Sequence, residues 1–105
     1  MGYGQAMILT SAQKKHLKGL AHSLNPVVHI GKLGVTADLI SEIQNQLKVH
    51  ELIKIRFGEF KDEKALLIEE LESKTQAACV GKIGHIAIFY QESPDKKNKI
   101  ALPKK

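Results

Sequence analysis

The segment from Pro26 to Thr36 places the strongest constraint on the fold, because a short apolar strand runs through two closely spaced glycines into a helical pattern. The glycines of Gly31-Lys32-Leu33-Gly34 allow a tight turn and a close approach of the main chain to a ligand. The start of the following helix offers free N–H groups and the positive end of a dipole, and Lys32 lies at the tip. This arrangement suits a phosphate group, but it is also typical of an ordinary strand-to-helix turn.

Hydrophobic periodicity predicts three helices. Apolar residues recur at helical spacing after Thr10 or Ser11 and again after Thr36, and each of these residues is a candidate N-cap. Asp62 is the candidate cap of a third, acidic helix. We therefore expect helices at about 10–24, 36–50 and 60–75, the first of them ended by the Asn25-Pro26 pair.

Strand patterns fill the intervals between these helices. Apolar residues alternate from Leu52 to Phe57, which is the period of a half-buried strand and places Lys54 and Arg56 on one face. A short strand is expected at 27–30, and two strands within 78–90. A second glycine pair, Gly81–Gly84, fits the turn between these two strands better than a ligand loop, because no helix follows it. The order α-β-α-β-α-β-β predicts a compact α/β domain with a four-stranded mixed sheet covered by helices.

The length and composition allow one domain with a modest core, since the chain has 105 residues of which 43% are hydrophobic. We expect this domain at residues 9–102, after a flexible leader at 1–8 and before a basic tail end at 103–105. No apolar run approaches the length of about 18 residues that a bilayer span needs. Together with the lone Cys79, which is typical of a small buried residue in a reducing compartment, this predicts a cytoplasmic protein.

The charges of the chain are segregated. Its net charge is +5 at pH 7, yet residues 1–37 contain no acid while residues 59–72 are rich in acids. Arg56 is the only arginine among sixteen cationic residues, which favours point contacts with phosphates over reading of base edges. A GxxG loop is also how one RNA-binding module clamps nucleotides. A merely solvated surface is the alternative interpretation of such charge runs.

Catalytic and metal-binding patterns are not evident in the sequence. The five histidines include no pair with zinc-finger spacing, and His16 and His22 do not share a helix face. No serine lies in a nucleophile-elbow pattern. We therefore expect neither an enzyme nor a cofactor, a metal or a small-molecule substrate.

Several motifs occur together in a characteristic order, and the chain closely resembles the bacterial YhbY-type, single-domain members of the CRM (chloroplast RNA splicing and ribosome maturation) family. The resemblance covers about residues 9–102. It rests on Leu17–His22, Pro26–Val28, Gly31–Gly34, His50–Ile55, Ile83-Gly84 and Phe89-Tyr90.

The resemblance implies a fold similar to the C-terminal domain of translation initiation factor three, and a non-catalytic RNA-binding role. It further implies association with large-subunit precursor ribosomal RNA in ribosome assembly. The family's loop maps onto Gly31, Lys32, Leu33 and Gly34, and its basic positions map onto Lys18, His22 and Lys54. Two residues depart from the family pattern: Gln91 stands where an arginine is usual, and Leu33 stands where a small polar residue is usual.

The candidate RNA-binding residues join the loop, the basic first helix and the cationic strand face. No membrane contact is expected, and the protein is expected to act as a monomer. A protein-interaction module on the ribosome or on a ribosome-associated protein, without a direct RNA clamp, is the alternative function. The candidate residues are Gly31, Lys32, Leu33, Gly34, Lys14, Lys15, Lys18, His22, Lys54 and Arg56.

Overall fold

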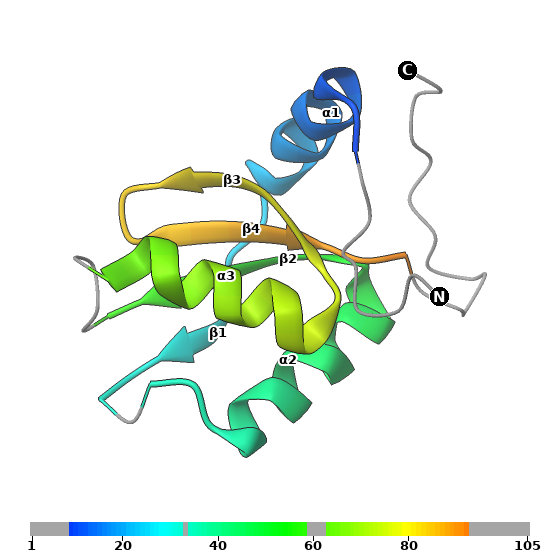
Figure 1. Ribbon diagram of the computed structural model, residues 1–105. Coiled ribbons are helices and arrows are strands. Elements are labelled where there is room, and N and C mark those ends of the chain that lie inside the picture. The colour runs from blue at the N-terminus through cyan, green and yellow to red at the C-terminus, as the bar shows by residue number, and fades with distance from the viewer. Residues whose placement is uncertain (1–8, 33, 59–62, 93–105) are drawn as a thin grey trace.

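The computed structural model describes residues 9–32, 34–58 and 63–92, and within them it confirms the predicted order of three helices and four strands (Figure 1). Leu33, the expected leader at 1–8 and the tail end at 103–105 lie outside the described residues. The proposed domain limits therefore stay a prediction. The elements are α1 (Ser11–Ala21), β1 (Pro26–Ile30), α2 (Ala37–His50), β2 (Leu52–Phe57), α3 (Lys64–Thr75), β3 (Ala78–Ile83) and β4 (Ile86–Tyr90).

The four strands form one mixed sheet in the order β1-β2-β4-β3. β1 and β2 are parallel and are connected through α2, whereas β4 is antiparallel to both β2 and β3. β3 and β4 form a hairpin with a two-residue turn, so the second glycine pair lies in a hairpin as predicted. Gly84 begins this turn with a φ of 57°, a conformation that favours glycine.

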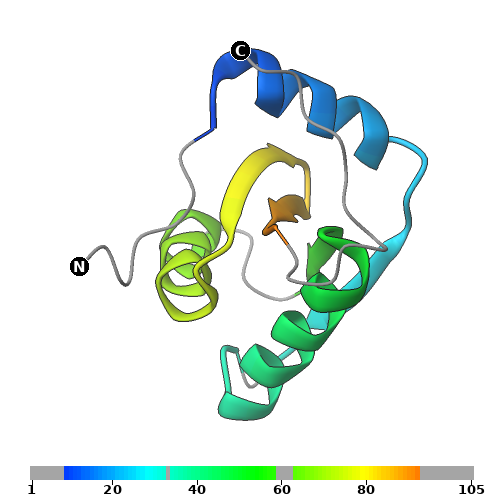
Figure 2. The same cartoon turned by 90° about the vertical axis from the view of Figure 1, so that its right-hand side faces the viewer.

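Helices cover both faces of the sheet, and each face has its own apolar core (Figure 2). On one face α2 and α3 pack on the sheet through buried residues such as Ile43 and Leu71. On the other face, the helix that packs within the described residues is α1, through Leu17 and Ala21. The described residues thus form three layers, and one of these layers is the short helix α1.

The inner strand β2 contributes side chains to both cores, as its alternating apolar pattern predicts. Ile53, Ile55 and Phe57 belong to the core under α2 and α3, while Leu52 belongs to the core under α1. Because successive side chains of a strand point to opposite faces, Lys54 and Arg56 lie on the α1 side of the sheet.

Side-chain caps define the starts of the first two helices. Thr10, not Ser11, caps α1: its hydroxyl accepts from the Gln13 N–H at 3.1 Å, and the Gln13 side chain accepts from the Thr10 N–H at 3.0 Å. Thr36 caps α2 by accepting from the Leu39 N–H at 3.1 Å. Asp62, the predicted cap of α3, lies outside the described residues.

The first helix is shorter than its apolar pattern predicts. It ends at Ala21, and Leu24 forms part of the following turn, with its N–H donating to the Ala21 carbonyl at 2.9 Å. Ala21 is the last residue of α1 that is buried against the sheet, and Leu24 is 38% exposed. None of the described helices is both long enough and apolar enough to cross a membrane.

The attachment of α1 to the sheet depends on few side chains, which makes it testable. Leu17 is fully buried, whereas Leu20, three residues later, is 41% exposed. We expect Leu17→Ala to lower the free energy of unfolding by about 2–5 kcal/mol, because it leaves a cavity between α1 and the sheet. Leu20→Ala, the matched control, should cost less than about 1 kcal/mol. Denaturant unfolding measures both, and equal losses would contradict this packing.

Candidate nucleic-acid interface

The glycine loop is a β-turn at the end of β1. The Gly34 N–H donates to the Gly31 carbonyl at 3.0 Å, and Lys32 follows Gly31 within this turn. Gly34 has a φ of 69°, which other residues rarely adopt. Gly31 has no such φ, and a Cβ added there would meet no atom within 4 Å. The sequence predicts that both glycines permit the turn. In the structure, Gly34 has a backbone conformation that favours glycine, whereas Gly31 has an ordinary one and has open space where a side chain would lie.

The start of α2 offers less to an anion than the sequence predicts. The Leu39 N–H is already taken by the Thr36 hydroxyl. Asp38 lies in the first turn, where its carboxylate itself interacts favourably with the helix dipole. The affinity of the loop for a phosphate therefore depends more on Lys32 and the turn than on the helix terminus.

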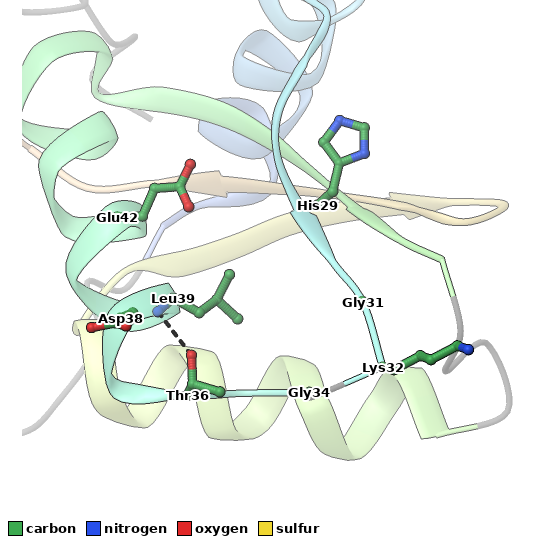
Figure 3. Close-up of a pocket in the computed structure, with 8 residues that line it drawn as sticks. All are labelled: His29, Gly31, Lys32, Gly34, Thr36, Asp38, Leu39 and Glu42. Carbon is green, nitrogen blue, oxygen red and sulfur yellow. Dashed lines mark hydrogen bonds between the residues drawn. The ribbon is translucent and has the colours of Figure 1, made fainter.

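An open pocket of about 410 Å³ lies between β1 and the first turns of α2 (Figure 3). The loop forms one end of the pocket, and Asp38 and Glu42 contribute carboxylates from α2. Figure 3 shows the Lys32 side chain pointing away from these carboxylates, and the His29 ring turned to the side of the sheet on which α1 lies. Two carboxylates repel a phosphate, so the pocket marks the boundary of an anion-binding surface rather than its centre.

The cationic face of β2 is joined to the end of α1. The Lys54 ammonium donates to the Leu24 carbonyl at 3.0 Å, which holds the link between α1 and β1 over β2. Arg56, two residues further along β2, is exposed. Both candidate residues therefore lie on the face of the sheet against which α1 packs.

Lys18 lies over the opposite edge of this face. A Cβ built at Gly81 would lie 3.1 Å from Lys18 Cε, so the aliphatic stem of Lys18 packs against the backbone of β3. The register of β3 with β4 shifts between Cys79 and Gly81, where the strand carries a bulge or irregularity. Gly81 thus leaves room for a cationic side chain, a role that the sequence did not reveal, because the contact joins residues far apart in the chain.

The candidate residues form a broad band rather than one cluster. Lys14, Lys15, Lys18 and His22 are all exposed, on α1 or just after it. Lys18 lies over β3, whereas the glycine loop follows β1 at the other edge of the sheet. Lys54 and Arg56 on β2 lie between these two parts.

The charge segregation predicted from the sequence corresponds to the layers of the fold. Of the described residues, those in α1 and the four strands include no acid. The described acids lie in α2, in α3 or next to these elements and at the end of β4. The α1 side of the molecule is therefore cationic, and the opposite side carries the acidic helices.

Three ionisable groups have shifted pKa values, and none of the three forms a reactive site. Burial raises the pKa of the Cys79 thiol, which keeps it protonated and unreactive. Burial, with the charge of Glu51 second, raises the pKa of Tyr90 to about 12. Burial and then the nearby Lys82 lower the pKa of Lys64. In the part of the chain that the structure describes, no three His, Cys, Asp or Glu residues are placed to hold a metal ion.

Gln91 takes a structural position at the end of β4. Its side-chain amide donates to the Thr75 carbonyl at 2.9 Å, and its backbone N–H donates to the Glu51 carbonyl at 2.9 Å. It thereby joins the end of the sheet to the last residue of α3. The residue that departs from the family pattern therefore contributes to packing on the side opposite α1.

The sequence matches the CRS1 / YhbY (CRM) domain over residues 9–91, which includes every helix and strand of the fold. The chain therefore belongs to the CRS1/YhbY (CRM) family, as its motifs predict.

Relatives of similar length carry names that refer to RNA. The chain is 46% identical over 98 residues to an "RNA-binding protein" of Haemophilus influenzae, covering 92% of this chain and 97% of the relative. It is 34% identical to the "Probable RNA-binding protein YqeI" of Bacillus subtilis, covering 91% of this chain and 100% of the relative. A solution structure of SAV1595 from Staphylococcus aureus, described as a candidate RNA-binding protein, superposes with a TM-score of 0.78 at 36% identity. This match covers 91% of this chain and 100% of the Staphylococcus aureus chain.

The different backbones of the two loop glycines predict different costs of substitution. Gly34→Ala should lower the free energy of unfolding by about 1 kcal/mol, because alanine is strained at a φ of 69°. Gly31→Ala should stay within about 0.5 kcal/mol of the wild type, because its methyl group enters open space. Thermal or denaturant unfolding checks this difference, and an equally large loss at Gly31 would show that the turn is not built as described.

Proposed function

We propose that this protein binds RNA without catalysing a reaction, through the glycine loop and the α1 side of the sheet. The observation that carries the proposal is the acid-free layer of α1 and the strands, which ends at a glycine turn with Lys32 directed outward. The names of the relatives support RNA as the partner. No small-molecule substrate or cofactor is part of the proposal.

The cations of this layer are suited to contacts with phosphates. Those on α1 are lysines, and Lys54 keeps its ammonium at the surface between α1 and β1. Lysine acts as a point charge and carries little sequence information when it contacts a phosphate. We therefore propose that affinity comes mainly from the RNA backbone, and that RNA shape determines where the protein binds.

The proposed cellular role is ribosome assembly, on precursor RNA of the large subunit, by a monomeric cytoplasmic protein. The family resemblance supports this role. Crosslinking by ultraviolet light in cells, followed by sequencing of the attached RNA, tests it. Crosslinks concentrated in large-subunit ribosomal RNA would support the role, whereas particle association that survives RNase, without RNA crosslinks, would favour a protein partner.

The salt dependence of binding tests the electrostatic part of the proposal. If about four phosphates are neutralised, a plot of log affinity against log salt should have a slope of roughly −3 to −4. Fluorescence anisotropy with a labelled ribosomal RNA fragment at several salt concentrations gives this slope. An affinity that does not change with salt would contradict the proposal.

Substitutions in the loop test its location. Gly31→Asp should fold normally, because the side chain enters open space, and should bind RNA more weakly, because the carboxylate repels phosphates. Lys32→Ala should weaken binding to all RNAs alike and reduce the magnitude of the salt slope by about one. Lys74→Ala is the matched control, because it also removes one lysine. Lys74 is paired with Glu70 on α3, and α3 lies on the side of the sheet opposite α1. Unchanged affinity of folded Gly31→Asp would place the RNA elsewhere.

A further inference from the structure

One row of side chains crosses all four strands near the end of the sheet that leads to the glycine loop. Ile83 of β3 pairs with Ile86 of β4, Ile86 pairs with Arg56 of β2, and Arg56 pairs with His29 of β1. Neighbouring strands are about 4.8 Å apart, so the row is about 14 Å long. We call these four residues the cross-strand row.

The cross-strand row faces the α1 side of the sheet. The sequence neighbours of Arg56 and His29, for example Ile55 and Ile30, are buried in the core under α2 and α3. Ala87, next to Ile86, is buried in the same core, and it pairs with Lys82 of β3. Because strand residues alternate between faces, the four members of the row point to the other side.

α1 does not cover this row. Leu17 and Ala21 of α1 pack with residues nearer the opposite end of the strands, such as Leu52 and Tyr90. Ile83 is 68% exposed, Arg56 and His29 are exposed, and Ile86 is half-buried. Figure 1 shows the turn between β3 and β4 extending beyond α1 on the left of the sheet. The row is therefore an open strip between the hairpin and the glycine loop.

Two main-chain hydrogen bonds and one side-chain hydrogen bond hold the ends of the strip in place. The Phe57 N–H donates to the His85 carbonyl at 2.7 Å, which joins β2 to the hairpin turn. The Gly58 N–H donates to the Ile30 carbonyl at 3.1 Å, which joins β2 to the start of the glycine loop. The Lys64 ammonium donates to the Gly84 carbonyl and attaches the hairpin to α3. A surface held in this way is ordered before a ligand arrives, which reduces the entropic cost of binding.

The chemistry of the strip differs from that of the surrounding lysines. Two isoleucines offer an apolar surface, the Arg56 guanidinium is a plane on which a base can stack, and His29 offers an imidazole ring. Duplex RNA presents mainly phosphates and hydroxyl groups to a protein, whereas unpaired bases expose their faces. Lys32 beyond one end of the strip and Lys18 beside β3 supply charges for the backbone of the same strand.

We propose that the cross-strand row is a docking site for unpaired RNA bases, so that the protein prefers single-stranded or looped RNA to continuous duplex. The inference rests on the proposed function and adds the class of RNA that is bound. The lysines and the glycine loop hold the backbone, and Ile83, Ile86 and Arg56 contact the base faces.

Binding of two forms of one RNA tests this proposal. A labelled single strand of mixed sequence and the same strand annealed to its complement are titrated with each variant. Ile83→Ser should weaken binding to the single strand about fivefold or more, because less apolar surface is buried against a base, with little change for the duplex and none in the salt slope. The matched control is Leu66→Ser, which removes a leucine that is 69% exposed on α3, and it should change neither affinity by as much as twofold.

Arg56→Lys provides a second, independent variant, because it keeps the charge and loses the plane on which a base stacks. It should reduce the preference for the single strand and keep the salt slope. If Ile83→Ser and Arg56→Lys both bind the single strand as the wild type does, the row is not a base-docking site. If the wild type binds neither form of RNA, the proposed function itself fails, and a protein partner becomes the occupant to test.

Discussion

The strand β2 pairs with a neighbour on each side, and its side chains alternate between the two faces of the sheet. This strand pairs with β1 on one side and with β4 on the other, and its side chains enter both apolar cores. Its last residue and the glycine that follows also bind the hairpin turn and the end of β1. The glycine loop, the hairpin and the cationic face are thus positioned by one buried element, and a change in the register of β2 would displace all three.

The candidate interface arises because helices cover one face of the sheet more completely than the other. Two helices close one face of the sheet, and these helices carry most of the described acids. Within the part of the chain that the structure describes, α1, a helix of 11 residues, covers only part of the other face. The uncovered part contains Arg56 and His29 next to two isoleucines, and the glycine loop follows at its edge. One architectural feature therefore accounts for the exposed strip and for the position of the cations around it.

Much of the fold could be predicted from local sequence patterns. The element order, the Thr36 cap and the limits of β2 follow from periodicity and capping chemistry, which act within a few residues. The sequence predicts a later end for α1, because Leu24 fits the helical spacing, but Leu24 lies in the turn that follows the helix and is 38% exposed. The unequal roles of Gly31 and Gly34 also depend on backbone angles that the GxxG pattern does not reveal.

The site could be predicted only in part. The loop and the lysines are visible as motifs, and the structure adds how they are arranged around the sheet. The alignment of Ile83, Ile86, Arg56 and His29 depends on strand order and register, which are set by pairing between distant segments. The contact between Lys18 and Gly81 and the carboxylates of Asp38 and Glu42 beside the loop have the same origin. No single segment of the sequence contains these juxtapositions.

RNA is proposed to contact the α1 side of the sheet and the glycine loop. Nuclear magnetic resonance of the labelled protein during titration with single-stranded RNA maps this contact, because each backbone amide reports its own surroundings. We expect the signals of Gly31, Lys32, Gly34, Arg56 and Ile83 to shift together, while those of the outer faces of α2 and α3 stay unchanged. Shifts concentrated on α2 and α3, with the loop unaffected, would contradict the proposal.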